Sequence, residues 1–227
     1  MTTTTARSDT DYAERELGAL ARDIPGATAV LREHHLDFCC GGQQTLAEAA
    51  QSRGLDVGAI SAQLAALDTG APPDAPTDAD SLIDHIVTRF HDGHRRELPE
   101  MIALATKVEQ VHAGHPEVPS GLSALLHRML DELQNHMQKE EQILFPMMRR
   151  NPGGFLAPPI ARMREEHAEH GEMLENMRWV AHDFVPPQQA CNTWRALYAG
   201  LAHFHAEFME HVHTENNILF PQFETAR

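Results

Sequence analysis

The stretch His136-Met-Gln-Lys-Glu140-Glu-Gln-Ile-Leu-Phe-Pro146 recurs near the C-terminus as His211-Val-His-Thr-Glu215-Asn-Asn-Ile-Leu-Phe-Pro221. A step of four residues turns an α-helix by about 400°, so the His and the Glu of each copy share one face. The isoleucine of each copy (Ile143 and Ile218) follows its histidine by seven residues and is expected on the same stripe. Each copy therefore presents an imidazole and a carboxylate above an apolar seam, which is how helical bundles hold metal ions in their cores.

The repeat extends upstream of both copies. His91-Asp-Gly-His94 precedes the first copy and His167-Ala-Glu-His170 precedes the second, and a leucine follows each at the same spacing. Matching residues should therefore lie at matching depths in two helical hairpins. The sequence predicts an all-α protein whose main part is an antiparallel four-helix bundle with a pseudo-two-fold axis.

Four imidazoles and two carboxylates are predicted to converge in the core of this bundle. They are His91, His136, Glu140, His167, His211 and Glu215. A single histidine on an apolar stripe is usually a hydrogen-bonded core residue, but a buried carboxylate is costly unless it is paired or bound to a cation. Because the whole set is duplicated, the pattern favours metal ligation.

Four other histidines of the bundle are not counted as ligands. His85 has no counterpart in the second half, and His213 lies two residues from His211 and so points away from it. His94 and His170 match each other but lie on a face turned away from the two glutamates. From there they could donate hydrogen bonds to the ligands.

The chemistry of the ligand set narrows the choice of metal. It contains no thiolate, which argues against zinc and against an iron–sulfur cluster. Mixed imidazole and carboxylate ligands suit iron or manganese, although zinc could be accepted. Two ions bridged by Glu140 and Glu215 would each have two histidines and two oxygens, and an oxo or hydroxo bridge would add a fifth ligand. One open position on each ion could then take a small ligand such as O₂ or NO.

Charge and cysteine content restrict the partners and the compartment. The chain has 18 Lys and Arg against 33 Asp and Glu, a formal net charge of −15. This charge argues against nucleic acid and anionic membranes as partners. Three cysteines, two of them adjacent, do not make the even pattern of a secreted disulfide framework. We see no signal peptide and no apolar run of about 20 residues, so we expect a cytoplasmic protein with no membrane partner.

The chain divides at a stretch rich in Pro, Asp and Ala. Residues 1–10 are expected to be disordered, 11–67 to form a small helical domain, 68–80 to be an extended linker and 81–227 to form the bundle. The small domain is expected to lean on a partner, because about 55 residues bury only a small core. The predicted helices are 27–34, 45–53, 56–67, 81–111, 120–150, 158–183 and 188–223.

The bundle resembles the haemerythrin-like superfamily, and the chain as a whole resembles the RIC family, the di-iron proteins for repair of iron centres. The resemblance covers almost the whole chain. It rests on Asp37-x-Cys39-Cys40-Gly41-Gly42 in an ScdA-type N-terminal domain, His91-Asp-x-His94, His136-Met-x-Lys-Glu140-Glu-Gln-Ile-Leu-Phe-Pro146, Glu166-His167 and His211-x-x-x-Glu215-Asn-Asn-x-Leu-Phe-Pro221. It implies that the cofactor is two iron ions and that the family's di-iron ligands fall on the six positions given above.

The sequence also departs from true haemerythrins. They carry a histidine four residues after the one in the third helix, whereas position 171 here is Gly. In the fourth helix they carry an Asp five residues after the histidine, whereas here Glu215 follows His211 by four. The missing imidazole disfavours simple reversible O₂ carriage and favours an open, reactive or iron-releasing site.

The resemblance implies repair of iron–sulfur clusters damaged by nitrosative or oxidative stress, either by donation of iron or by removal of NO. Damaged iron–sulfur proteins would be the clients, and the protein would be a homodimer. Two alternatives stay open: an NO reductase that forms nitrous oxide, and a non-enzymatic sensor or store of NO or O₂. Glu166 resembles a family residue near the site and could relay protons or guide metal, or it could be an ordinary solvent-facing glutamate.

The adjacent cysteines are a second candidate for function. Cys39 and Cys40 could form a strained disulfide that is easily reduced. Gly41 and Gly42 give access to them, so they could pass electrons or hold iron in transit. The alternative is two small residues buried in a small core. Cys191 begins the last predicted helix and is expected to be structural.

Overall fold

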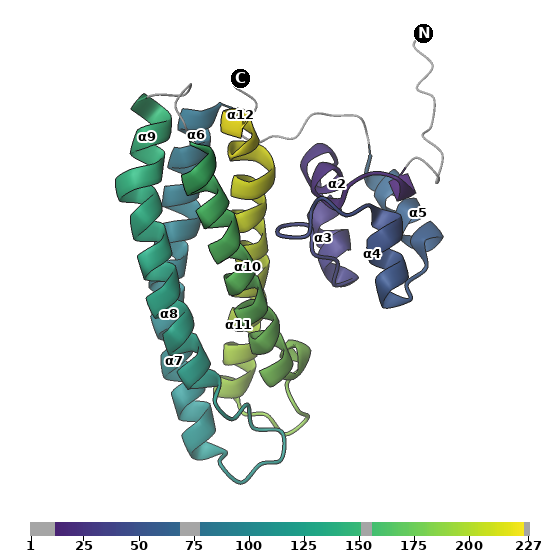
Figure 1. The fold of residues 1–227 in the computed structure, drawn as a ribbon. Helices are drawn as coiled ribbons and strands as arrows, with labels where there is room; N and C mark the ends of the chain where they lie inside the picture. The colour runs from purple at the N-terminus through teal and green to yellow at the C-terminus, as the bar shows by residue number, and fades with distance from the viewer. Residues whose placement is uncertain (1–11, 69–77, 151–155, 225–227) are drawn as a thin grey trace. The chain divides into compact units, whose positions relative to one another are not determined.

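The computed structural model describes residues 12–68, 78–150 and 156–224, and helices account for nearly all the regular structure there (Figure 1). The predicted disorder of residues 1–10 and most of the predicted linker lie outside the described residues. The described residues form two compact units. One holds the N-terminal part together with Val212–Pro221, and the other holds Asp78–His211 with the residues from Gln222 onward. In the described part of the chain, no helix combines the length and the apolarity needed to span a bilayer.

The N-terminal unit is built from short helices, two of which begin at side-chain caps. They are α2 (Leu17–Asp23), α3 (Ala27–Glu33), α4 (Leu46–Arg53) and α5 (Val57–Leu67). Thr45 and Glu48 form a capping box at the start of α4, and the Asp56 carboxylate accepts two backbone N–H bonds at the start of α5. The three predicted helices of this region are confirmed to within a residue or so, and α2 was not predicted.

This small unit also includes a segment from the far end of the chain. The amide of Asn216 donates to the carbonyl of Cys39 at 3.1 Å, and the amide of Asn217 donates to the carbonyl of Phe38, also at 3.1 Å. The ring of Phe38 meets His213 edge-on, with 5.5 Å between the ring centroids. These contacts fix the backbone of the Asp37–Gly42 loop, where the carbonyls have no helical partners.

Gly42 is needed where this loop passes closest to its neighbours. A Cβ at position 42 would lie 2.7 Å from the carbonyl oxygen of Phe38 and 3.0 Å from Oδ1 of Asn217. We therefore expect Gly42→Ala to lower the free energy of unfolding by about 1–3 kcal/mol, because a backbone carbonyl cannot rotate away as a side chain can. Urea denaturation followed by circular dichroism measures this. Gly114→Ala is the matched control, since a Cβ there would meet nothing within 4 Å, and equal stability of the two variants would contradict the prediction.

The second unit is the predicted four-helix bundle. Its first two stretches are α6 (Ala79–His85), η1 (Ile86–His91) and α7 (Asp92–Val111), then α8 (Leu122–Lys139), η2 (Glu140–Leu144) and α9 (Phe145–Arg150). The third stretch is α10 (Ala157–Val180), which the short 3₁₀ turn η3 (His182–Phe184) follows. The fourth is α11 (Asn192–His213), which continues through η4 (Thr214–Leu219), a segment grouped with the first unit, to α12 (Pro221–Glu224). α8 lies between α7 and α10, and the long helices run side by side (Figure 1). Short connections between successive helices make neighbours antiparallel.

Three of the four stretches contain a π-helical turn, which was not predicted. These turns are η1, η2 and η4, and they contain His91, Glu140 and Glu215 respectively. A π turn holds one more residue than an α turn and therefore rotates every following side chain about the axis. The expectation that Ile143 lies on the inner stripe is accordingly wrong. Its side chain is 56% exposed, and Leu144 is buried in its place.

Candidate metal centre

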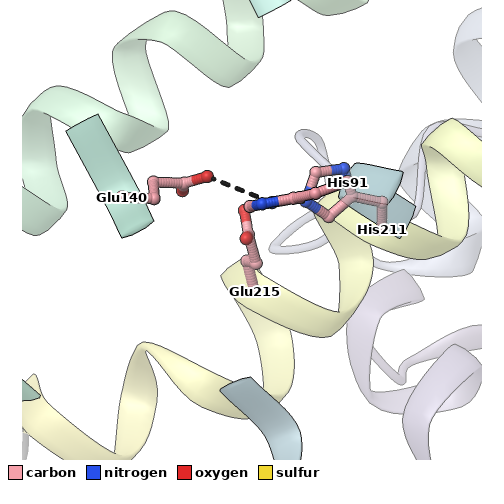
Figure 2. Close-up of side chains that lie close together, drawn as sticks. All are labelled: His91, Glu140, His211 and Glu215. Atoms are coloured by element: carbon pink, nitrogen blue, oxygen red, sulfur yellow. Dashed lines mark hydrogen bonds and ion pairs between the residues drawn. The ribbon is translucent and has the colours of Figure 1, made fainter. Parts of the chain in front are cut away.

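The six side chains predicted to be ligands come together in the structure. His91 ends η1, His136 is in α8, Glu140 begins η2 and His167 is in the middle of α10. His211 and Glu215 stand one turn apart on the last helical stretch. Each of the six residues is at most 1% exposed. Figure 2 shows His91 and Glu140, each from its own helix, reaching toward His211 and Glu215 of the C-terminal helical stretch.

The six residues form two overlapping groups that could each hold a metal ion. His91 and His211 make one group with both glutamates, and His136 and His167 make the other with the same two glutamates. Within each group the nearest ligand atoms all lie within 4.8 Å of one another. Glu140 and Glu215 belong to both groups, so the two groups overlap at these carboxylates.

The distances between nitrogens fit this description. Nε2 of His91 lies 3.1 Å from Nε2 of His211, and Nε2 of His136 lies 3.0 Å from Nε2 of His167. Two nitrogens bound to one ion at about 2.1 Å and at right angles would be about 3.0 Å apart. Glu140 directs Oε2 to His91 at 3.5 Å and Oε1 to His136 at 3.4 Å. One carboxylate thus presents one oxygen to each group.

Two further carboxylates orient the histidines. Nδ1–H of His91 donates to Glu141 at 2.7 Å, and Nδ1–H of His136 donates to Glu166 at 2.8 Å. A histidine that donates from Nδ1 presents the lone pair of Nε2, so both rings have the tautomer that a metal ion needs. These bonds and the ligand types together show that the residues present fit a cation.

Glu166 is not solvent-facing, so that interpretation of it is wrong. The residue is 4% exposed. Besides His136 it accepts from Lys139 at 2.7 Å and from Arg162 at 3.0 Å. Burial acts to raise the pKa of Glu166, but the hydrogen bonds from Lys139 and His136 outweigh it and bring the pKa to about 2. Glu166 is therefore a carboxylate at neutral pH. Its role in relaying protons or guiding metal stays a prediction.

Glu141 is a site residue that sequence analysis missed. On an ideal α-helix it would lie about 100° away from Glu140, on a different face. In the structure, the π turn η2 begins at Glu140, directly after α8, and Glu141 is its second residue. Its neighbour Arg95 also donates to it, at 2.7 Å. The only signal in the sequence was the Glu140-Glu141 doublet, which is common on any charged helix.

The four histidines that the sequence analysis did not count as ligands lie in different surroundings. His94 is buried, and its Nε2 lies 3.2 Å from Nδ1 of His211, within hydrogen-bond distance. His170 is buried with its ring centroid 5.0 Å from that of His136. His213 contacts Asn217 at 2.9 Å, and His85 packs edge-on against Phe90. None of these four belongs to a ligand group among the described residues.

The adjacent cysteines are free thiols. Cys39 is buried and Cys40 is half-buried, with 3.9 Å between their sulfur atoms. Asp37 accepts from both backbone N–H groups, and with the two thiols it forms a third group that could hold a metal ion. The hydrogen bond with Cys40, together with burial, raises the pKa of Cys39 well above its ordinary value. A redox or iron-carrying role for the pair stays a prediction.

Cys191 does not have the structural role expected from the sequence. It is exposed, it directly precedes α11, and its sulfur lies 3.3 Å from Nε2 of His112. Backbone N–H groups at the start of α11, led by that of Trp194, and the His112 ring lower the pKa of Cys191 to about 7.

Alkylation of Cys191 by iodoacetamide should therefore rise with pH around a midpoint near 7. The reactive form is the thiolate, so its fraction sets the rate. In the His112→Ala variant the midpoint should move upward, because one of the groups that favour the thiolate is gone. Peptide mass spectrometry separates Cys191 from Cys39 and Cys40. A midpoint unchanged in the variant would contradict the assignment of His112.

An all-helical bundle with two overlapping groups of buried histidines and glutamates is a cation-binding bundle. Comparison with known proteins agrees. Residues 82–223 match the model of the hemerythrin HHE cation binding domain, and residues 13–68 match ScdA_N, a domain of unknown function (DUF542).

Relatives match over nearly their whole length. An iron–sulfur cluster repair protein YtfE of Yersinia pseudotuberculosis serotype IB is 49% identical over 217 residues, which is 93% of this chain and 97% of the relative. The protein of the same name from Musicola paradisiaca is 50% identical over 214 residues, 93% of this chain and 96% of the relative. One from Yersinia pestis strain Pestoides F is 48% identical over 217 residues, again 93% and 97%. The chain belongs to the haemerythrin HHE cation-binding family, in the two-domain YtfE (RIC) group that also carries an ScdA_N domain.

Proposed function

We propose that this protein binds two iron ions and repairs iron–sulfur clusters damaged by nitrosative or oxidative stress. One observation carries the proposal: two buried groups of ligands, each with two histidines, share Glu140 and Glu215. The names of the relatives give the process, since each is an iron–sulfur cluster repair protein. A pair of ferrous ions bound there would supply iron that can leave the protein and electrons for NO or O₂ as a small ligand.

The proposed ligands are His91 and His211 for one ion, His136 and His167 for the other, and Glu140 and Glu215 as bridges. Imidazole and carboxylate ligands without thiolate suit iron. Glu141 and Glu166 hold His91 and His136 so that Nε2 faces the ions, and His94 lies within hydrogen-bond distance of Nδ1 of His211. The apolar shell around them, including Phe90, Phe145 and Phe208, excludes water from the centre.

The proposal extends to the setting of the reaction. Damaged iron–sulfur proteins are the clients, the protein acts in the cytoplasm, and it forms a homodimer. The resemblance to the repair family supports these three points. Donation of iron and removal of NO are both compatible with the ligand set. In the first case iron leaves the protein, and in the second the iron stays and the product formed from NO leaves.

The deciding experiment starts from the iron-loaded, reduced protein. Under our proposal, mixing it with an apo-cluster protein in the presence of added sulfide restores the cluster and lowers the iron content of the donor. Catalytic formation of nitrous oxide from excess NO would instead identify an NO reductase. Bound NO with neither turnover nor iron transfer would identify a sensor or store. The Cys39→Ser/Cys40→Ser double variant goes through the same assays, and unchanged results would remove the two thiols from the mechanism.

A further inference from the structure

The two halves of the candidate metal centre hold their histidines in different ways. Behind His91 stands Glu141, whose side chain is 28% exposed and whose other described partner is Arg95. The side chain of Arg95 is itself 34% exposed. One partly exposed ion pair therefore supports the carboxylate that orients this ligand, and contact with solvent weakens such a pair.

Behind His136 stands Glu166, whose side chain is 6% exposed. Lys139 binds one of its oxygens at 2.7 Å and Arg162 binds the same oxygen at 3.0 Å, while His136 takes the other. The side chains of Lys139 and Arg162 are themselves 39% and 54% exposed, so the burial of Glu166 and the number of its partners restrain this carboxylate. A ligand whose supporting carboxylate is restrained keeps its metal more tightly.

A pocket of about 330 Å³ opens at the surface of the first half. Its walls are apolar where Ile83, Val87 and Phe145 line it. The polar lining is Glu141 and the ion pair between Asp84 and Arg149, which are 2.6 Å apart. Glu141 therefore lies between solvent in the pocket and the ring of His91. Carboxylate oxygens are the ligands that a hydrated divalent cation meets first when it leaves or enters such a site.

We propose that the two ions are unequal: the ion held by His91 and His211 exchanges through this pocket, and the ion held by His136 and His167 is retained. Glu141 is a positioning residue for His91 and the first carboxylate on the exit path of a divalent iron cation. This inference rests on the proposed function and deepens it, because it names the half of the centre that gives up iron. Each round of donation then releases one ion, and the retained ion keeps the bundle in shape for reloading.

The test is the release of ferrous iron from the loaded, full-length protein to a coloured chelator in excess. We expect two phases of equal amplitude, one ion each. Glu141→Ala should speed the fast phase about 10–100-fold and leave the slow phase unchanged, because loss of a carboxylate behind a metal-binding histidine costs that much in affinity. Glu166→Ala should speed the slow phase. Gln142→Ala, an exposed neighbour in η2, is the control and should change neither phase.

Two further variants separate positioning from general damage to the bundle. Glu141→Gln keeps an oxygen that accepts from Nδ1 of His91, so its fast phase should lie between those of wild type and Glu141→Ala. Thr88→Trp puts a large ring into the pocket from an exposed lining residue and should slow the fast phase alone. Thermal melting of the metal-free variants checks that each is folded.

Single-phase release from the wild type would overturn the inference, as would an effect of Glu141→Ala on the slow phase or a fast phase indifferent to Thr88→Trp. None of these results needs a client protein. If cluster repair succeeds while release has one phase, the inference fails and the proposed function stands. If release has two phases but no client is repaired, the proposed function fails and the inequality of the ions stands.

Discussion

Glu140→Gln protein, loaded with ferrous iron and passed through a desalting column, should keep less than one ion per chain where the wild type keeps two. Glu140 is the residue that presents one oxygen to His91 and the other to His136. A neutral amide cannot bridge two cations in this way, so both positions lose a ligand and a compensating charge. The loss of affinity should exceed the roughly 100-fold upper end seen for residues that only support a ligand. Iron content by colorimetric assay or mass spectrometry measures the result.

The matched control for this variant is Glu132→Gln, on the exposed face of the same helix α8. It removes the same charge from the chain and should keep both ions. The Glu140→Gln variant should still fold without metal, because it replaces a fully buried charged group with a neutral one of similar size. Two ions retained by Glu140→Gln would contradict the assignment of Glu140 as the shared ligand.

Removal of the metal should lower the melting temperature of the wild type by roughly 8–16 °C for each ion when free iron had been about 1,000 times its dissociation constant. The metal-free core holds Glu140 and Glu215, which are both 0% exposed. A carboxylate oxygen of one lies within 4.8 Å of a carboxylate oxygen of the other. Buried like charges at such separations destabilise the folded state, and a cation between them reverses the sign of that contribution. Differential scanning calorimetry with and without a strong chelator measures the change.

Glu140→Gln is also the control for this second experiment. Since it should hold little iron, chelator should shift its melting temperature far less than that of the wild type. Adding iron back to the stripped wild type should restore the original melting temperature. A wild-type melting temperature that does not respond to metal would show that the six residues form a stable polar cluster without a cation.

The parts of the site that could be predicted from the sequence are those that depend only on the periodicity of a single α-helix. His136 and Glu140 must share a face because four residues make about one turn, and the same holds for His211 and Glu215. The duplicated pattern then required two hairpins, and it identified all six converging side chains before any coordinates. The helix positions followed from the same local rule, and they agree with the structure within a few residues.

The unpredicted parts arise where packing changes the local rule. An α-helical pattern placed Ile143 inward, but the π turn that begins at Glu140 rotates it out, and Glu141 in the same turn accepts a hydrogen bond from His91. Whether an α-helical turn becomes a π turn depends on its backbone hydrogen bonds and on how side chains from other helices pack against it. The packing of other helices cannot be predicted from the spacing of residues along one helix.

The sequence by itself therefore determined the helical class, the pairing of hairpins and the identity of the six candidate ligands, since each depends on spacing along one helix. Only the tertiary structure decided how the ligands are supported. It placed Glu141 beside an open pocket, buried Glu166 under Lys139 and Arg162, and set His112 against the thiol of Cys191. These contacts join residues far apart in the chain, and their geometry depends on how whole helices pack against one another.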